Sequence, residues 1–226
     1  MRKRIMAKLA VAAFLITIGS NATASLIITG VIDGPLSGGI PKAVEIYVAS
    51  DIADLSVYGL GSANNGGGSD GEEFTFTAIA ASAGDFIYLS FEAPGFTSFF
   101  GFAPDYTTDA MLINGNDAVE LFANGVVVDV FGEITVDGSG QPWDYQDGWA
   151  YRNNDTGPDG PSFILGNWAF SGTDALDGTD TNTAAATPFP LASYSPRAAN
   201  AVPEPATIAI FSFGLLGLMF SRKKFF

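Results

Sequence analysis

The chain has 226 residues with 24 acidic and 10 basic side chains, and it contains neither cysteine nor histidine. The lack of both residue types excludes disulfide bonds, thiolate or imidazole metal sites, and Ser-His or Cys-His catalytic pairs. Residues 25–201 hold three basic residues against 23 acidic ones, a net charge of −20. Such a surface repels nucleic-acid phosphates and attracts cations, so we expect no nucleic-acid partner.

The N-terminus has the pattern of a secretory signal peptide. Basic residues open the chain, an apolar run follows at 9–18, and Ala22 and Ala24 form a small-x-small cleavage site. We therefore expect residues 1–24 to be removed and the rest of the chain to be exported.

The middle of the chain predicts an all-β fold. Short apolar or alternating runs recur about every ten residues with turn signals between them, which is typical of two packed sheets. The first five predicted strands are 26–31, 43–48, 55–60, 74–77 and 85–91. We expect no helix of useful length between the two ends of the chain.

The clearest predicted element is a hairpin around Asn124-Gly125, because this dipeptide between two apolar runs favours a two-residue turn. Such a turn pairs Val119 with Val130 and Leu121 with Val128, with all four side chains in the core. It also places Glu120 opposite Asp129, which is unfavourable for like charges. A solvated face, a bulge or a bound cation would each relieve this repulsion, and we favour the solvated face.

The middle region resembles the lamin-tail domain, an immunoglobulin-like β-sandwich. The likeness rests on short stretches, which are 44–47 with 54–60, 83–89, 116–121 with 128–132, Trp143, 148–152 and 167–168. It extends over about residues 26–171, and the segments 64–71 and 96–109 depart from it as insertions. The resemblance implies a single sandwich domain at 25–172 that acts as a binding or structural module.

A segment at 137–152 interleaves aromatic and acidic residues. The candidates for ligand binding are Trp143, Asp144, Tyr145 and Asp147. The two rings could stack on sugars while the carboxylates hold hydroxyl groups or a cation. The alternative, which we favour, is that Trp149 and Tyr151 cap the core and Arg152 pairs with an aspartate, because large aromatic side chains dominate such cores.

An acidic segment follows near residue 180. The candidate calcium ligands are Asp174, Asp177, Asp180 and Asn182, since calcium prefers oxygen ligands of this kind. The alternative, again favoured, is a solvated acidic loop. Residues 173–201 are rich in Thr, Ala, Asp and Pro, so we expect a linker here.

The C-terminal end of the chain has three parts. The first part is formed by Val202, Pro203, Glu204 and Pro205, and the third by the basic residues Arg222, Lys223 and Lys224. Between them an apolar run predicts a short transmembrane helix at 206–221 with its basic end in the cytoplasm. This tail, 202–226, resembles the PEP-CTERM sorting signal of Gram-negative bacteria, which implies recognition and removal by an exosortase. A plain membrane anchor is the alternative.

Taken together, the sequence predicts an exported protein that inserts transiently in the inner membrane and then reaches the cell surface or the extracellular matrix. We expect a non-catalytic binding or structural role, linked through the sorting tail to extracellular polysaccharide or biofilm. The alternatives are a glycan hydrolase that uses Asp144 and Asp147 as acid and base, or an accessory module for extracellular nucleic-acid processing.

Overall fold

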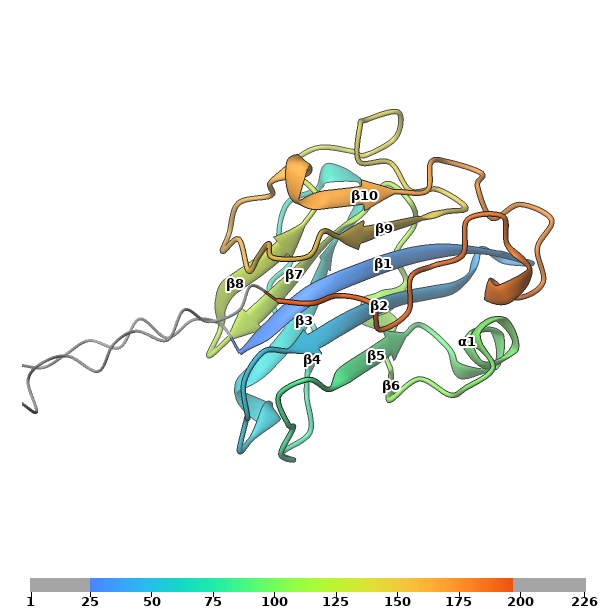
Figure 1. The fold of residues 1–226 in the computed structure, drawn as a ribbon. Coiled ribbons are helices and arrows are strands. Elements are labelled where there is room, and N and C mark those ends of the chain that lie inside the picture. Colours follow the sequence, from blue (N-terminus) through green and yellow to red (C-terminus); the bar gives the residue numbers. More distant parts are fainter. Residues whose placement is uncertain (1–24, 197–226) are drawn as a thin grey trace, which may run out of the picture.

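In a computed structural model, residues 25–196 are described, and they form two β-sheets with one short α-helix (Figure 1). The strands are β1 (Leu26–Leu36), β2 (Ile40–Val48), β3 (Tyr58–Ala63), β4 (Phe74–Thr75), β5 (Phe86–Ser90), β6 (Tyr106–Thr107), β7 (Ala118–Ala123), β8 (Val126–Phe131), β9 (Trp149–Arg152) and β10 (Trp168–Phe170). One sheet has the order β10-β9-β1-β2-β5-β6 and the other has the order β4-β3-β7-β8. The prediction of a fold built mainly from two β-sheets is therefore confirmed.

The six-stranded sheet is built around the long β1–β2 hairpin, and its strands alternate between two buried faces. Ile28, Val44 and Leu89 point toward the other sheet, where they join the main core. Ile27 and Ala43 point the other way and are also buried. Strands buried on both faces read as nearly continuous apolar runs, which explains why 26–31 lacks a polar face in the sequence.

The four-stranded sheet contains the Asn124-Gly125 hairpin, but its register differs from the predicted one. Val119 lies opposite Phe131, Glu120 opposite Val130 and Leu121 opposite Asp129, with a register shift before Phe122. The bulge separates Glu120 from Asp129, so the repulsion expected from a regular hairpin does not arise. Our preference for a solvated face is wrong, because both carboxylates are buried.

A second layer covers the outer face of the six-stranded sheet. It consists of α1 (Ala93–Phe100) and the C-terminal strap, which we define as residues 173–196 (Figure 1). Glu92 caps the helix by accepting a hydrogen bond from the Gly95 N–H, and Gly101 ends it in a left-handed conformation. Two predictions are therefore wrong. A helix is present at 93–100, where none of useful length was expected, and residues 173–196 of the predicted linker 173–201 are packed against the sheet.

The strap packs because its few apolar residues are spaced to reach the sheet. Leu176, Phe189 and Tyr194 are buried against this face, and Phe189 lies 5.4 Å from Tyr151 between ring centroids. The Tyr151 hydroxyl accepts hydrogen bonds from the N–H groups of Ser193 and Tyr194, each at 3.0 Å. The low apolar content of the segment predicts a linker. It does not reveal the packing of the strap, because the apolar surface that the strap contacts belongs to β2 and β9.

The buried carboxyl group of Glu45 on β2 fixes the end of the strap. Its oxygens accept hydrogen bonds from Thr29 at 2.7 Å, from Tyr151 at 2.7 Å and from the Ala192 N–H at 2.8 Å. Burial raises the pKa of Glu45, while the bonds from Ala192, Thr29 and Tyr151 act in the opposite direction.

Residues 1–24 and 197–226 lie outside the described part of the chain. The predicted signal peptide, its cleavage site and the tail helix at 206–221 all fall within these two ranges. Between residues 25 and 196, no helix is both long and apolar enough to cross a membrane.

Candidate functional site

A polar cleft of about 420 Å³ lies at the turn of the β1–β2 hairpin, between that turn and the loops that follow β3, β6 and β8. The side chains that line it are almost all polar. They include Asp33, Lys42, Asn65, Asn114, Asn116 and Gln146, with Ser139 and Asp147 beside them. The volume falls in the range of about 300–1,000 Å³ that small-molecule sites occupy.

The base of the cleft is a buried ion pair between directly opposed residues of β1 and β2. Lys42 Nζ donates to Asp33 Oδ1 at 2.8 Å, and both side chains are only 6% exposed. The same ammonium group donates to Asn114 Oδ1 at 2.8 Å. Asp33 Oδ2 accepts a hydrogen bond from the Gly115 N–H at 2.9 Å, so the ion pair also fixes the loop that carries Asn114.

Two loops meet at backbone level above this pair. A Cβ atom on Gly115 would lie 2.0 Å from Gln146 Cα, so only glycine permits the approach. The Tyr145 N–H donates to the Gly115 carbonyl at 2.8 Å. The position of Gln146 at the cleft therefore depends on the backbone rather than on flexible side chains.

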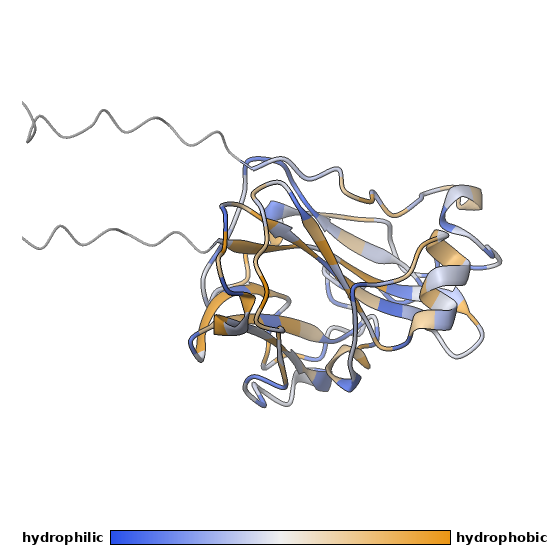
Figure 2. Ribbon diagram, turned by 90° about the horizontal axis from the view of Figure 1, so that it is seen from below, coloured by the Kyte–Doolittle hydropathy of each residue, from blue (hydrophilic) through white to orange (hydrophobic). Residues whose placement is uncertain are grey.

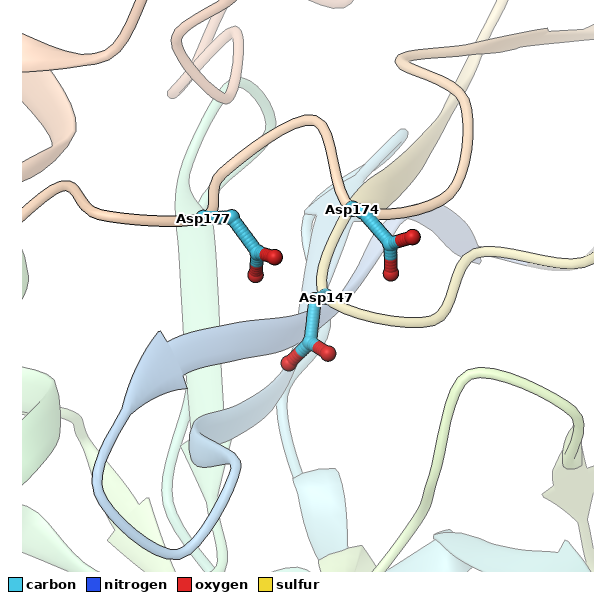
Figure 3. Close-up of side chains that lie close together, drawn as sticks. All are labelled: Asp147, Asp174 and Asp177. Atoms are coloured by element: carbon cyan, nitrogen blue, oxygen red, sulfur yellow. The ribbon is translucent and has the colours of Figure 1, made fainter.

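Three carboxylates gather at the edge of the cleft. Asp147, Asp174 and Asp177 each have an oxygen within 4.8 Å of the others (Figure 3). Their loops are joined by two backbone bonds, from Asp174 N–H to the Gln146 carbonyl at 2.8 Å and from Leu176 N–H to the Asp147 carbonyl at 3.0 Å. Partial burial raises the pKa of Asp147, and the nearby charges of Asp33, Asp177 and Asp174 add to this.

The predicted calcium ligands divide into two groups in the structure. Asp174 and Asp177 lie together, and the third carboxylate of the group is that of Asp147, a residue of the segment 137–152. Asn182 is buried, and its side-chain amide bonds both the N–H and the carbonyl of Phe189, so it is a structural residue. Asp180 is exposed and lies outside the group of three.

The predicted sugar-binding aromatic residues are part of the core. Trp143 is 3% exposed and Tyr145 is fully buried, and both pack against Phe131. Their rings cannot stack on a ligand. Both oxygens of Asp144 accept backbone hydrogen bonds, from Gly140 at 2.7 Å and Gln146 at 3.1 Å.

The favoured alternative for this segment agrees with the geometry. Trp149 and Tyr151 are buried in the layer beneath the strap. Arg152 pairs with Asp129 and Asp159.

Sequence reasoning missed the amides of the cleft. Asn114 and Asn116 share one loop, whereas Asn65 lies 51 residues before Asn116, so no local pattern joins all three. Lys42 is one of the three basic residues in 25–201, and a lone lysine in an apolar strand is itself a signal of a buried partner.

A second cavity, of about 530 Å³, opens beside β5 and β6. Its walls include Leu55, Ile79, Phe86 and Tyr106, with Asp85 and Asp105 at its edge. Each of these two carboxylates accepts a backbone hydrogen bond, from Ser82 and Tyr88 respectively. The two groups hold their own loops, and both are exposed.

Comparison with protein families matches residues 201–223 to the family described as the PEP-CTERM protein-sorting motif. The chain carries a PEP-CTERM sorting signal. The PEP-CTERM match includes Pro203, Glu204, Pro205 and the basic residues Arg222 and Lys223, and it implies export with exosortase-dependent sorting to the cell surface. Comparisons with curated proteins and with solved structures gave no match.

Proposed function

We propose that this chain is a non-catalytic protein of the cell surface or extracellular matrix, and that its folded part binds or organises extracellular polysaccharide. The observation that carries the proposal is the PEP-CTERM motif at 201–223, which directly follows a packed and strongly acidic folded part. The secretory signal at 1–24 and transient inner-membrane insertion through 206–221 belong to the same proposal.

The lamin-tail likeness also belongs to this proposal. It is supported by the two-sheet architecture and by the buried β7–β8 hairpin, which carries one of the matching stretches. The PEP-CTERM match does not extend to the folded residues, so the likeness rests on those short stretches. A single immunoglobulin-like sandwich fits a binding module without catalytic machinery.

The charges support a partner other than nucleic acid. Among residues 25–196, the basic side chains are those of Lys42 and Arg152, and both are buried and paired with carboxylates. Neither is free to neutralise a phosphate, so we expect no salt-dependent complex with DNA or RNA.

The hydrolase alternative gains no support from the pair it was based on. Both oxygens of Asp144 are bound to backbone N–H groups, so this carboxylate is held in place as a loop cap. A glycosidase acid or nucleophile needs free access to the scissile bond.

Sorting is tested by intact-mass analysis of the protein isolated from the cell surface of a host with an exosortase. We expect loss of the residues after the Pro-Glu-Pro motif, and retention of the tail in an exosortase-deficient host. Full-length protein in the inner membrane of the competent host would contradict the sorting proposal.

Polysaccharide association is tested by fractionating the extracellular matrix. We expect the mature protein to sediment with polysaccharide and to be released when the matrix is digested with glycosidases, but not with nuclease. Equal release by nuclease would favour the nucleic-acid alternative instead.

A further inference from the structure

We propose that the polar cleft beside the Asp33–Lys42 pair binds one neutral, hydroxyl-rich sugar unit of a polysaccharide. The proposal rests on the proposed function and names its site. The cleft differs from the aromatic segment that the sequence suggested, because its lining is formed by carboxamides and a buried ion pair.

The first argument is the set of hydrogen-bonding atoms left free at the cleft. Lys42 Nζ has three donors and, within residues 25–196, gives hydrogen bonds to Asp33 and Asn114 only. Asn114 uses its oxygen in this bond, so its amide N–H groups remain available. Asn116 shows the reverse pattern, because its amide nitrogen bonds Asn65 and Asp137 and its oxygen remains available.

These atoms place donors and acceptors side by side. A sugar hydroxyl donates one hydrogen bond and accepts up to two, so it can use both kinds of atom at once. The exposed amide of Gln146 adds a donor and an acceptor to the same lining, and Asp147 adds a second acceptor. A purely anionic or purely cationic ligand would leave half of this lining unused.

Charge selects a neutral ligand. Asp33 compensates the ammonium group of Lys42 at 2.8 Å, and the carboxylate of Asp147 lines the same cleft. The net field is therefore negative, and it repels phosphate and uronate groups. The lining also lacks an aromatic or large aliphatic side chain, which disfavours a lipid or another apolar ligand.

The cleft is preorganised. Lys42 is 5% exposed, and the Gly115–Gln146 backbone contact fixes the two loops that face it. Little ordering cost remains for the protein on binding. Because no ring is present for stacking, we expect a dissociation constant on the order of 1 mM for a single sugar, with higher apparent affinity for a repeating polymer.

The test is saturation-transfer difference NMR on the full chain in a zwitterionic detergent. The probes are methyl glycosides of glucose, galactose, mannose and N-acetylglucosamine, with glucuronate and inorganic phosphate as charged comparisons. We expect signals that saturate with at least one neutral glycoside and weaker or no binding of the two anions. The absence of a saturable signal from all four glycosides, or tighter binding of an anion, would overturn the proposal.

Variants then locate the binding. Gln146→Ala removes an exposed amide whose side-chain neighbour is the Asp147 carboxylate at the edge of the cleft, so we expect the fold to stay intact. Asn114→Ala removes a second amide and also a partner of Lys42. We expect affinity to fall by about two- to tenfold for each. Gln141→Ala, an exposed amide of the same loop outside the cleft, should leave affinity unchanged.

The outcomes separate the site from the wider function. Matrix association that persists while glycosides bind equally to wild type and Gln146→Ala would overturn the cleft proposal and leave the proposed function standing. Saturable, Gln146-dependent glycoside binding without matrix association would support the cleft and contradict the proposed cellular role.

Discussion

Arg152 on β9 and Asp129 on β8 form a buried ion pair that joins the two sheets. The Arg152 Nη2 atom donates to both oxygens of Asp129 at 2.8 Å, and neither side chain is exposed. Asp159 accepts from the Arg152 Nη1 atom at 2.7 Å, and the guanidinium carbon lies 4.4 Å from the centroid of the Trp168 ring.

The backbone of β1 completes this arrangement. β9 pairs with β1 at Gly30–Ile32 and not at Ile28, so the N–H and carbonyl of Ile28 face the ion pair instead. The N–H donates to Asp129 at 2.9 Å, and the carbonyl accepts from Arg152 at 2.6 Å. Every charge in this group is therefore matched by a partner in a different strand or loop, which makes the pair a specific link between the sheets.

The first prediction concerns Asp129→Asn. The substitution leaves the buried guanidinium of Arg152 with one compensating carboxylate, so we expect the free energy of unfolding to fall by about 3–5 kcal/mol. Chemical denaturation of the two proteins measures this difference. Asp70→Asn, at an exposed loop position, should change stability by less than about 0.5 kcal/mol. A loss of similar size in both variants would show that the pair is not a link between the sheets.

The second prediction concerns the hairpin core. Leu121 is fully buried between the sheets, and Leu121→Ala should cost about 2–5 kcal/mol. Val126 belongs to the same hairpin but is 65% exposed, so Val126→Ala serves as the matched control with little expected effect. An unfolding midpoint for Leu121→Ala equal to that of the control would contradict the observed register.

Local patterns predicted the strands well, and long-range packing accounts for what they missed. Alternation and turn residues located β2, β5, β7 and β8, because these signals depend on adjacent residues. The bulge in the β7–β8 hairpin places Asp129 where its side chain reaches Arg152, which is 23 residues away. No hairpin rule contains that requirement.

The strap and the cleft were missed for a related reason. Phe189 and Tyr194 are isolated apolar residues in a polar segment, and they become core only because the six-stranded sheet has a second apolar face. The cleft gathers Lys42, Asn65 and Asn114 from three separate loops and strands. In contrast, the sorting motif was recognised from the sequence, because its three parts are contiguous.

The third prediction concerns the anchoring of the strap. Tyr151→Phe removes a hydroxyl that donates to Glu45 and accepts from Ser193 and Tyr194. We expect a loss of about 1–3 kcal/mol because buried polar groups lose their partner. Limited proteolysis should also cut near residue 190 earlier than in the wild type.

Tyr47→Phe is the control for this variant. Tyr47 packs in the same layer, and its hydroxyl makes no hydrogen bond within the described part of the chain. Equal protease sensitivity in both variants would show that the hydroxyl of Tyr151 does not hold the strap.

The fourth prediction is a pH dependence at Asp147. Burial and the neighbouring carboxylates raise its pKa above the ordinary value of 3.8, so the folded state binds this proton more tightly than the unfolded state. The stability linked to that proton is complete below the unfolded pKa and is lost as pH rises through the folded pKa. We therefore expect Asp147→Asn to be more stable than the wild type at pH 7, with a difference that disappears near pH 3.

The size of this effect is limited by solvent, since Asp147 is only partly buried. A gain of a few tenths of a kcal/mol is expected after screening. Asp147 has a φ of 44°, a conformation that asparagine tolerates well, so backbone strain does not enter. Asp155 also has a positive φ but lies outside the three carboxylates, and Asp155→Asn controls for the substitution itself. Melts in chelator that show the same shift for both variants would contradict the prediction.

The last prediction concerns calcium at Asp147, Asp174 and Asp177. Their oxygens lie within 4.8 Å of one another on two joined loops, and a cation there would relieve the repulsion between them. We expect an affinity of about 10⁻⁴–10⁻³ M, as in extracellular modules, and a stabilisation of about 1 kcal/mol at millimolar calcium. Magnesium should stabilise less, because these loops do not offer its octahedral geometry.

The measurement is a thermal melt in calcium, in magnesium and in sodium chloride of matched ionic strength. Asp174 has a φ of 58°, so Asp174→Asn removes one charge while asparagine keeps the loop conformation. This variant should lose the response to calcium while its melting midpoint in sodium chloride stays the same or rises. If calcium raises the wild-type midpoint no more than the other two salts do, the three carboxylates are only a solvated acidic surface beside the cleft.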